Sequence, residues 1–107
     1  MAIPELTTEQ RRANLEKAME LRKKRASIRA AISAGEMTMR EVLELSAHAG
    51  DAINGMRVSS LITAFPNVGL KRMQAIMRKC GISASRRVRG LGVRQWKRLL
   101  AVFGDDA

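Results

Sequence analysis

Two segments of this 107-residue chain, each at the start of a helix-forming run, carry the pattern of a helix capping box, in which a hydroxyl residue is followed three positions later by Glu or Gln. The first runs from Thr7 to Gln10 and the second from Thr38 to Glu41. Both are followed by residues of high helix propensity, and no stretch alternates apolar and polar residues as a half-buried strand does. The pattern predicts an all-α fold.

Glycines mark where the expected helices end. The first helix should stop at Gly35, the second near Gly50, and a later one at Gly81, because glycine readily closes a helix C-terminus. Asp51 to Gly55 reads as a turn or a single helical turn. Apolar residues at helical spacing predict further helices over residues 58–65, 69–79 and 92–103, with a connector over residues 82–88.

The long first helix has an uneven apolar face. Ile28 and Ile32 are well placed for packing, whereas the run from Arg22 to Arg25 is polar around most of the helix. We therefore expect a packed C-terminal half and an N-terminal half that is partly free in solvent. The Arg22–Arg25 run fits two interpretations: a solvated face paired with nearby glutamates, or a supporting phosphate contact.

These features divide the chain into two parts. Residues 1–35 are expected to form an extended arm, held away from helix by Pro4, and the long helix. Residues 36–107 are expected to form a compact helical module that ends in a short tail.

The charge of the chain is strongly asymmetric. The formal net charge is +10, and no Asp or Glu occurs between Ala52 and Gly104, although Lys and Arg continue throughout. A field of one sign over half a chain repels itself and indicates a polyanionic partner, whereas a surface chosen for solubility mixes signs. Nucleic acid is the favoured partner, and the alternative is a basic surface with no dedicated ligand.

Two short turns of similar design precede basic helices. In Asn67-Val68-Gly69 and in Gly90-Leu-Gly92, an apolar residue lies between two residues that tolerate a positive φ. Such turns would point free N–H groups at an anion beside a helix N-terminus. We expect both turns and the arginines between them to face one row of phosphates. The predicted DNA-binding residues are Val68, Gly69, Leu70, Lys71, Arg86, Arg87, Arg89, Gly90, Gly92 and Arg94.

Other classes of function have little support in the sequence. One histidine, His48, and one cysteine, Cys80, give neither a metal cluster nor a disulfide within the chain, and they form no nucleophilic triad. The basic half lacks paired carboxylates for acid–base chemistry. We therefore expect no enzyme, no cofactor, no metal and no small-molecule substrate.

The expected location follows from the same composition. The lone thiol fits a reducing cytoplasm, and no apolar run approaches the length of about 20 residues that a membrane span needs. Trp96 shares its spacing with the apolar residues of the last helix, so it is expected in the core and not as a stacking platform for bases. Duplex DNA is therefore favoured over a single strand.

Four segments of the chain resemble the actinobacterial integration host factor family. They are Ile3-Pro-Glu-Leu-Thr-Thr-Glu-Gln-Arg11, Val58-Ser-Ser-Leu-Ile-Thr-Ala-Phe-Pro-Asn-Val-Gly69, Ala75-Ile-Met77 and Arg86-Arg-Val-Arg-Gly-Leu-Gly92. The resemblance spans nearly the whole chain, and the last of the four segments is the most specific. Asn67, where relatives often carry a basic residue, and Trp96, in a usually polar stretch, depart from the family pattern.

The resemblance implies a nucleoid-associated protein that binds duplex DNA with little sequence preference and bends it. Its expected fold is a long N-terminal helix followed by a helix-two-turn-helix (S13-like) module. By the same resemblance, Arg86, Arg87 and Arg89 are the expected DNA contacts, beside the Val68-Gly69 turn and Lys71. The implied roles are chromosome organisation, transcription regulation and site-specific recombination, performed in the cytoplasm at the nucleoid by a monomer.

Two questions stay open at this point. The chain is also similar to ribosomal small-subunit protein S13, which binds RNA through the same kind of module. That family carries a long basic C-terminal tail, whereas this chain ends in Asp105-Asp106-Ala107, which favours DNA. The basic N-terminal helix leaves open a second DNA contact that would bridge two duplexes.

Overall fold

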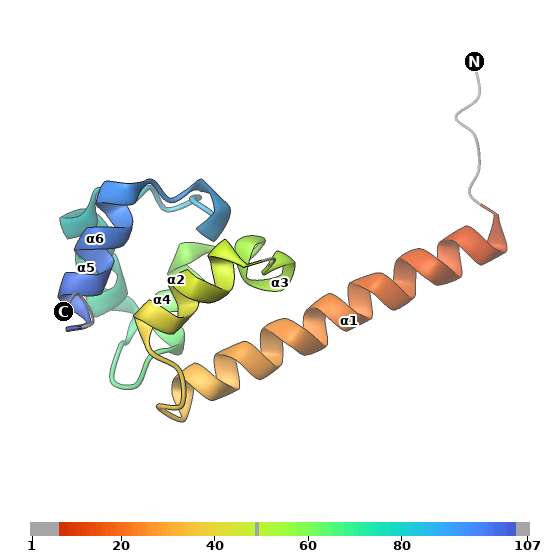
Figure 1. Ribbon diagram of the computed structural model, residues 1–107, viewed down its shortest axis with the longest axis horizontal. Helices are drawn as coiled ribbons and strands as arrows, with labels where there is room; N and C mark the ends of the chain where they lie inside the picture. Colours follow the sequence, from red (N-terminus) through yellow and green to blue (C-terminus); the bar gives the residue numbers. More distant parts are fainter. Residues whose placement is uncertain (1–6, 49, 105–107) are drawn as a thin grey trace, which may run out of the picture.

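The computed structural model describes residues 7–48 and 50–104, and the elements within these residues are all helical (Figure 1). The all-α class predicted from the sequence is thus confirmed. The arm over residues 1–6 and the tail over residues 105–107, both expected above, lie outside the described residues. In chain order the elements are α1 (Thr8–Ser33), α2 (Met39–Ala47), α3 (Asp51–Asn54), α4 (Val58–Ala64), α5 (Leu70–Cys80), the 3-10 turn η1 (Val88–Gly90) and α6 (Val93–Val102).

Both predicted capping boxes are formed. The hydroxyl of Thr7 accepts from the N–H of Gln10 at 3.1 Å, and the Gln10 side chain accepts from the N–H of Thr7 at 2.9 Å. Thr38 and Glu41 make the same reciprocal pair at 3.1 and 3.2 Å. Each box satisfies amide donors that a helix start would otherwise leave unpaired, so α1 and α2 begin where the sequence predicted.

The shorter elements also follow the sequence pattern. Gly81 ends α5 with a φ of 68°, in the left-handed region that glycine adopts without steric strain. The turn expected over residues 51–55 is the single-turn helix α3, and the expected connector over residues 82–88 leads directly into η1. The helix predicted over 92–103 is present as α6.

The core is aliphatic and lies between α2, α4, α5 and α6, with the C-terminal end of α1 against it. Trp96 is buried, as expected, and Phe65 packs against Phe103 with ring centroids 4.4 Å apart. Among the described residues, no polar or charged side chain is buried. The largest fully buried side chains are Ile32, Met39, Ile53, Leu61, Ile62 and Leu99.

Helix α1 extends well beyond the module that it joins (Figure 1). Its C-terminal half contacts α3 and α4 and buries Ile32, whereas every residue from Thr7 to Glu20 is exposed. The radius of gyration is 16.2 Å, against about 13 Å for a compact domain of this length. The expectation of a packed half and a free half is confirmed.

Cys80 lies at the end of α5 and is fully buried. Burial raises the pKa of its thiol, and the nearby charges of Arg98 and Lys79 offset this only in part. Because the thiolate is the reactive form, we expect iodoacetamide to label Cys80 slowly in the native protein at neutral pH and rapidly in urea. A raised pKa in the folded state also means that this thiol lowers stability as pH rises above about 8.5, where the unfolded thiol ionises. Mass spectrometry measures how fast iodoacetamide labels the thiol, and rapid labelling without denaturant would contradict the expected slow reaction.

Candidate nucleic-acid interface

The arginine-rich segment is held in place by its backbone. The N–H of Val58 donates to the carbonyl of Arg86 at 3.0 Å, and the N–H of Val88 donates to the carbonyl of Met56 at 2.9 Å. The side chain of Val88 points into the core and is 1% exposed. This anchor leaves Arg86, Arg87 and Arg89 exposed on either side of it. We call the segment from Arg86 to Arg89 the arginine loop.

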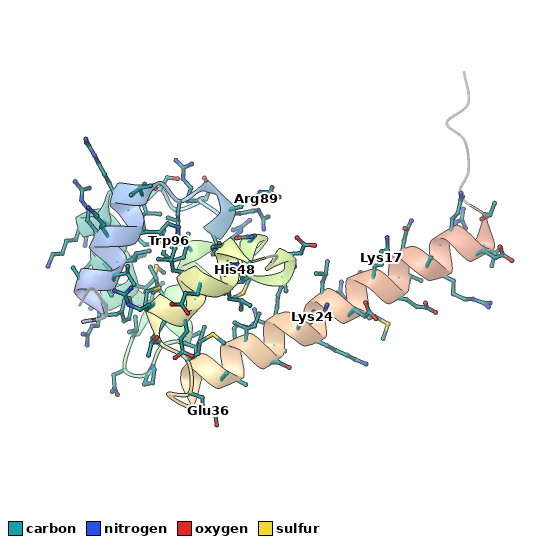
Figure 2. All side chains as sticks on the ribbon, viewed as in Figure 1. Lys17, Lys24, Glu36, His48, Arg89 and Trp96 are labelled. Atoms are coloured by element: carbon teal, nitrogen blue, oxygen red, sulfur yellow. The ribbon has the colours of Figure 1, made fainter. Side chains whose placement is uncertain are left out.

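The three arginines of this loop are not equivalent. Nη1 of Arg87 donates to the carbonyl of Gly55 at 2.5 Å, so its guanidinium is tied to the C-terminal end of α3. Nη1 of Arg86 donates to the carbonyl of Gly90, four residues along the same loop, at 3.3 Å. The Arg89 side chain makes no hydrogen bond to any described residue and projects from the turn above α3 (Figure 2). Arg89 thus offers all of its donors to a ligand.

A shallow hollow of about 420 Å³ lies among these arginines. Two serines, Ser83 and Ser85, line it together with Gly90 and the three arginines. Hydroxyl groups donate readily to phosphate oxygens, so the hollow presents neutral and cationic donors side by side. Sequence reasoning missed both serines; their only signal was a polar pair directly before the arginine run.

The turn from Gly90 to Gly92 differs from its sequence prediction. Its three amides are all used within the protein: those of Gly90 and Leu91 donate to the carbonyls of Arg87 and Val88, and that of Gly92 donates to the Gln95 side chain. Gly92 has a φ of −82°, which any residue adopts. The expectation of outward-pointing amides at a turn with positive φ is therefore wrong here. The turn's function is to start α6, which carries Arg94 at its exposed N-terminal end.

The turn from Asn67 to Gly69 matches its prediction more closely. Asn67 has a φ of 65°, and the side chain of Val68 is buried in the core. Gly69 has a φ of −86°, and no atom lies within 4 Å of the position that a side-chain carbon would take there. No side chain caps the start of α5, so its first amides face outward beside exposed Leu70 and Lys71.

The two turns lie at different ends of the module. The Gln95 side chain donates to the carbonyl of Gly81 at 2.9 Å, which places the start of α6 beside the C-terminal end of α5. Gly69 precedes the other end of α5, about 16 Å away along a helix of this length. That both turns and the arginines face one row of phosphates stays a prediction, and such a row would have to span about the length of α5.

The local charge is uniformly positive near both turns. Asp51, at the start of α3, is the last acidic residue before the tail, so no carboxylate within residues 52–104 competes with a ligand for the arginines.

Within the described residues, no group of three His, Cys, Asp or Glu side chains is placed to hold a metal ion. None of the described helices is long and apolar enough to cross a lipid bilayer.

Comparisons with known proteins agree with this geometry. A family described as an S13-like H2TH domain matches residues 32–103. A protein named Integration host factor from Mycobacterium tuberculosis is 43% identical over 105 residues, covering 98% of this chain and 99% of the relative. The Integration host factor of Streptomyces coelicolor is also 43% identical over 105 residues, covering 98% and 97%. A solved structure of sIHF bound to an 8-bp palindromic DNA is similar at a TM-score of 0.79 and 39% identity, covering 83% of this chain and 99% of that one.

Proposed function

Because the chain belongs to the integration host factor family of actinobacteria, we propose that it is a nucleoid-associated protein that binds double-stranded DNA through its arginine loop. It binds with low sequence specificity, and it bends or compacts the duplex. It thereby supports chromosome organisation, transcription regulation and site-specific recombination, and it acts as a monomer at the nucleoid in the cytoplasm.

The observation that carries this proposal is that the arginine loop exposes three arginine side chains around one hollow. Arg89 projects freely, Arg86 and Arg87 lie beside it, and two serine hydroxyls line the hollow between them. Guanidinium groups pair with phosphate oxygens in two places and stay charged, so the loop fits a sugar–phosphate strand. Arg94, which is exposed in the first turn of α6, extends this surface, whereas the amides of Gly90 and Gly92 are bonded within the protein and add no donors to it.

Low specificity follows from the type of donor. Contacts from cationic side chains, hydroxyls and amides to phosphate position a protein on a duplex but do not identify its bases.

The Val68–Lys71 end of the module is assigned as a second, separate contact. Leu70 there is 64% exposed, which suits a groove wall or a base step. Bending would arise when two such contacts, held at a fixed distance by α4 and α5, draw the duplex onto the module.

Salt dependence tests this proposal directly. If four to seven phosphates are neutralised, log K for unrelated duplexes should fall with log salt at a slope of about −4 to −6, because each phosphate contact releases condensed counterions. Fluorescence anisotropy over a salt series measures the slope, and a slope near zero would reject the electrostatic interface. Duplex RNA of equal length is the informative competitor, because the match of residues 32–103 to an S13-like H2TH domain leaves RNA as the alternative partner.

We also propose that the protein has no catalytic activity. No acid–base pair faces the arginine loop among residues 52–104, where carboxylates are absent. Incubation with duplex DNA that contains an abasic site tests this, since a lyase would cleave the strand and a purely binding protein would leave it intact.

A further inference from the structure

The exposed half of α1 separates its charges onto two faces. With 3.6 residues per turn, Glu9, Glu16 and Glu20 lie about 140–180° around the helix from Arg25. They are the acidic residues of α1, so one face of the helix carries all of its negative charge. Arg11 and Arg22 lie only about 40–60° from Arg25. The face that carries Arg11, Arg22 and Arg25 is called the α1 arginine face below.

Arg25 connects this face to the arginine loop. Its Nε donates to the carbonyl of Ala52 at 2.9 Å, and its Nη2 occupies the space that a side-chain carbon on Gly55 would take. Arg87 binds the carbonyl of the same Gly55. Two guanidinium groups, one from α1 and one from the arginine loop, therefore meet at the C-terminal end of α3, whose carbonyls favour cations.

The direction of the α1 arginine face follows from this junction. Arg25 points toward α3, and the arginine loop lies over α3 on that side of α1 (Figures 1 and 2). Residues nearer the N-terminus that lie on the same side of α1 as Arg25 project toward the side of the arginine loop. They do so beyond the edge of the module. A duplex on the arginine loop that continued beyond Gly55 would therefore run over Arg22 and Arg11.

The arginines on this face also lack local partners. No acidic residue stands three or four positions from Arg11 or Arg22, the spacing at which helix side chains pair. Arg12 and Lys23, one residue further along, each have a glutamate at that spacing: Glu9 and Glu16 for Arg12, and Glu20 for Lys23. Arg11 and Arg22 thus lack the glutamate partners that Arg12 and Lys23 have, as does Arg29, which lines a hollow with Ser60 and Thr63 of α4.

A second copy of the chain fits this helix poorly. Leu15 and Met19 are 64% and 54% exposed and would be the centre of an antiparallel helix pair. That pairing would place Arg12 of one copy opposite Arg22 of the other, so like charges would meet beside a small apolar contact. The α1 arginine face, which carries only positive charge, is complementary to a polyanion.

We propose that α1 is a second arm of the same DNA site, and that one duplex held by the arginine loop extends along the α1 arginine face. Arg11 and Arg22 are assigned as phosphate contacts and Arg25 as the residue that fixes the angle between helix and loop. Arg11 and Arg25 are about 21 Å apart along the helix, which corresponds to about 6 bp of duplex at 3.4 Å per pair. This proposal rests on the proposed function and adds a length requirement to it.

Duplex length and helix face provide the test. The variant R11A/R22A should bind a duplex of about 20 bp on the order of tenfold more weakly than the natural chain, with a salt slope reduced by about two. On an 8-bp duplex, the length in the related complex, the variant should bind within about twofold of the natural chain, because the short DNA is filled by the arginine loop. Anisotropy titrations at matched salt measure both ratios.

The chain supplies a matched control. R12A/K23A removes the same net charge at the same separation on the glutamate face, and it should bind both duplexes like the natural chain. All four positions are exposed, and alanine favours helix, so circular dichroism should be unchanged; R11Q/R22Q, which preserves side-chain bulk, should repeat the loss. Equal losses in the two alanine pairs, or an equal loss of R11A/R22A on both duplex lengths, would overturn the assignment. Failure of the natural chain to bind either duplex would instead overturn the proposed function itself.

Discussion

Alanine at Arg86, Arg87 and Arg89 together should remove most of the affinity for duplex DNA and reduce the salt slope by about three, because three phosphate contacts are lost. The three single substitutions should differ in their effects on affinity and on stability, because the three side chains differ in their hydrogen bonds. Arg89→Ala should weaken binding at unchanged stability, since its side chain makes no hydrogen bond to any described residue. Arg87→Ala should also lower the free energy of unfolding slightly, by up to about 1 kcal/mol for a charged hydrogen bond that is exposed to solvent, because it loses its bond to Gly55.

Two measurements on each variant distinguish these effects. Anisotropy titration gives the change in affinity, and urea unfolding gives the change in stability. Arg12→Ala is the matched control, because it removes one exposed charge from the glutamate face of α1 and should alter neither quantity appreciably. Wild-type affinity in Arg89→Ala would remove the arginine loop from the interface.

Replacing Ile32 with alanine should strongly lower the free energy of unfolding. Ile32 is 0% exposed and is the buried residue of α1, so its side chain secures the long helix to the module. Truncating a buried isoleucine leaves a cavity and usually costs about 2–5 kcal/mol. Thermal unfolding should therefore shift down by about 4–8 °C for each kcal/mol lost.

Leu15→Ala is the natural comparison for that variant. Leu15 lies in the same helix and is 64% exposed, so the same kind of truncation should change the unfolding temperature little. Alanine also has a slightly higher helix propensity. Equal destabilisation by the two substitutions would mean that the outer half of α1 packs against something that the structure does not place there.

The boundaries of the helices could be predicted because their signals are local. Thr7 and Thr38 begin α1 and α2, and Gly81 ends α5, through hydrogen bonds and backbone angles that involve only nearby residues. Periodicity alone likewise placed Trp96 in the core, where it is 9% exposed. Such features require no knowledge of how the helices pack.

The arrangement of the candidate site could not be predicted in the same way. The Gly69 turn and the Gly92 turn look alike in sequence, yet the distance between them depends on how α6 packs against α5. The bonds from Arg87 to Gly55 and from Arg25 to Ala52 join residues 32 and 27 positions apart. For Arg25, neither interpretation of the basic run anticipated a backbone carbonyl as its partner.

The overhang of α1 also governs how one chain moves through water. A ball with a projecting rod has a larger frictional coefficient than a sphere of equal mass, and this protein measures 51 Å along its longest axis against 26 Å along its shortest. A single 11.8-kDa chain therefore leaves a gel-filtration column earlier than a rounded protein of the same mass. Early elution is accounted for by the outline of one molecule, and sedimentation equilibrium, which weighs the particle regardless of outline, distinguishes that from pairing.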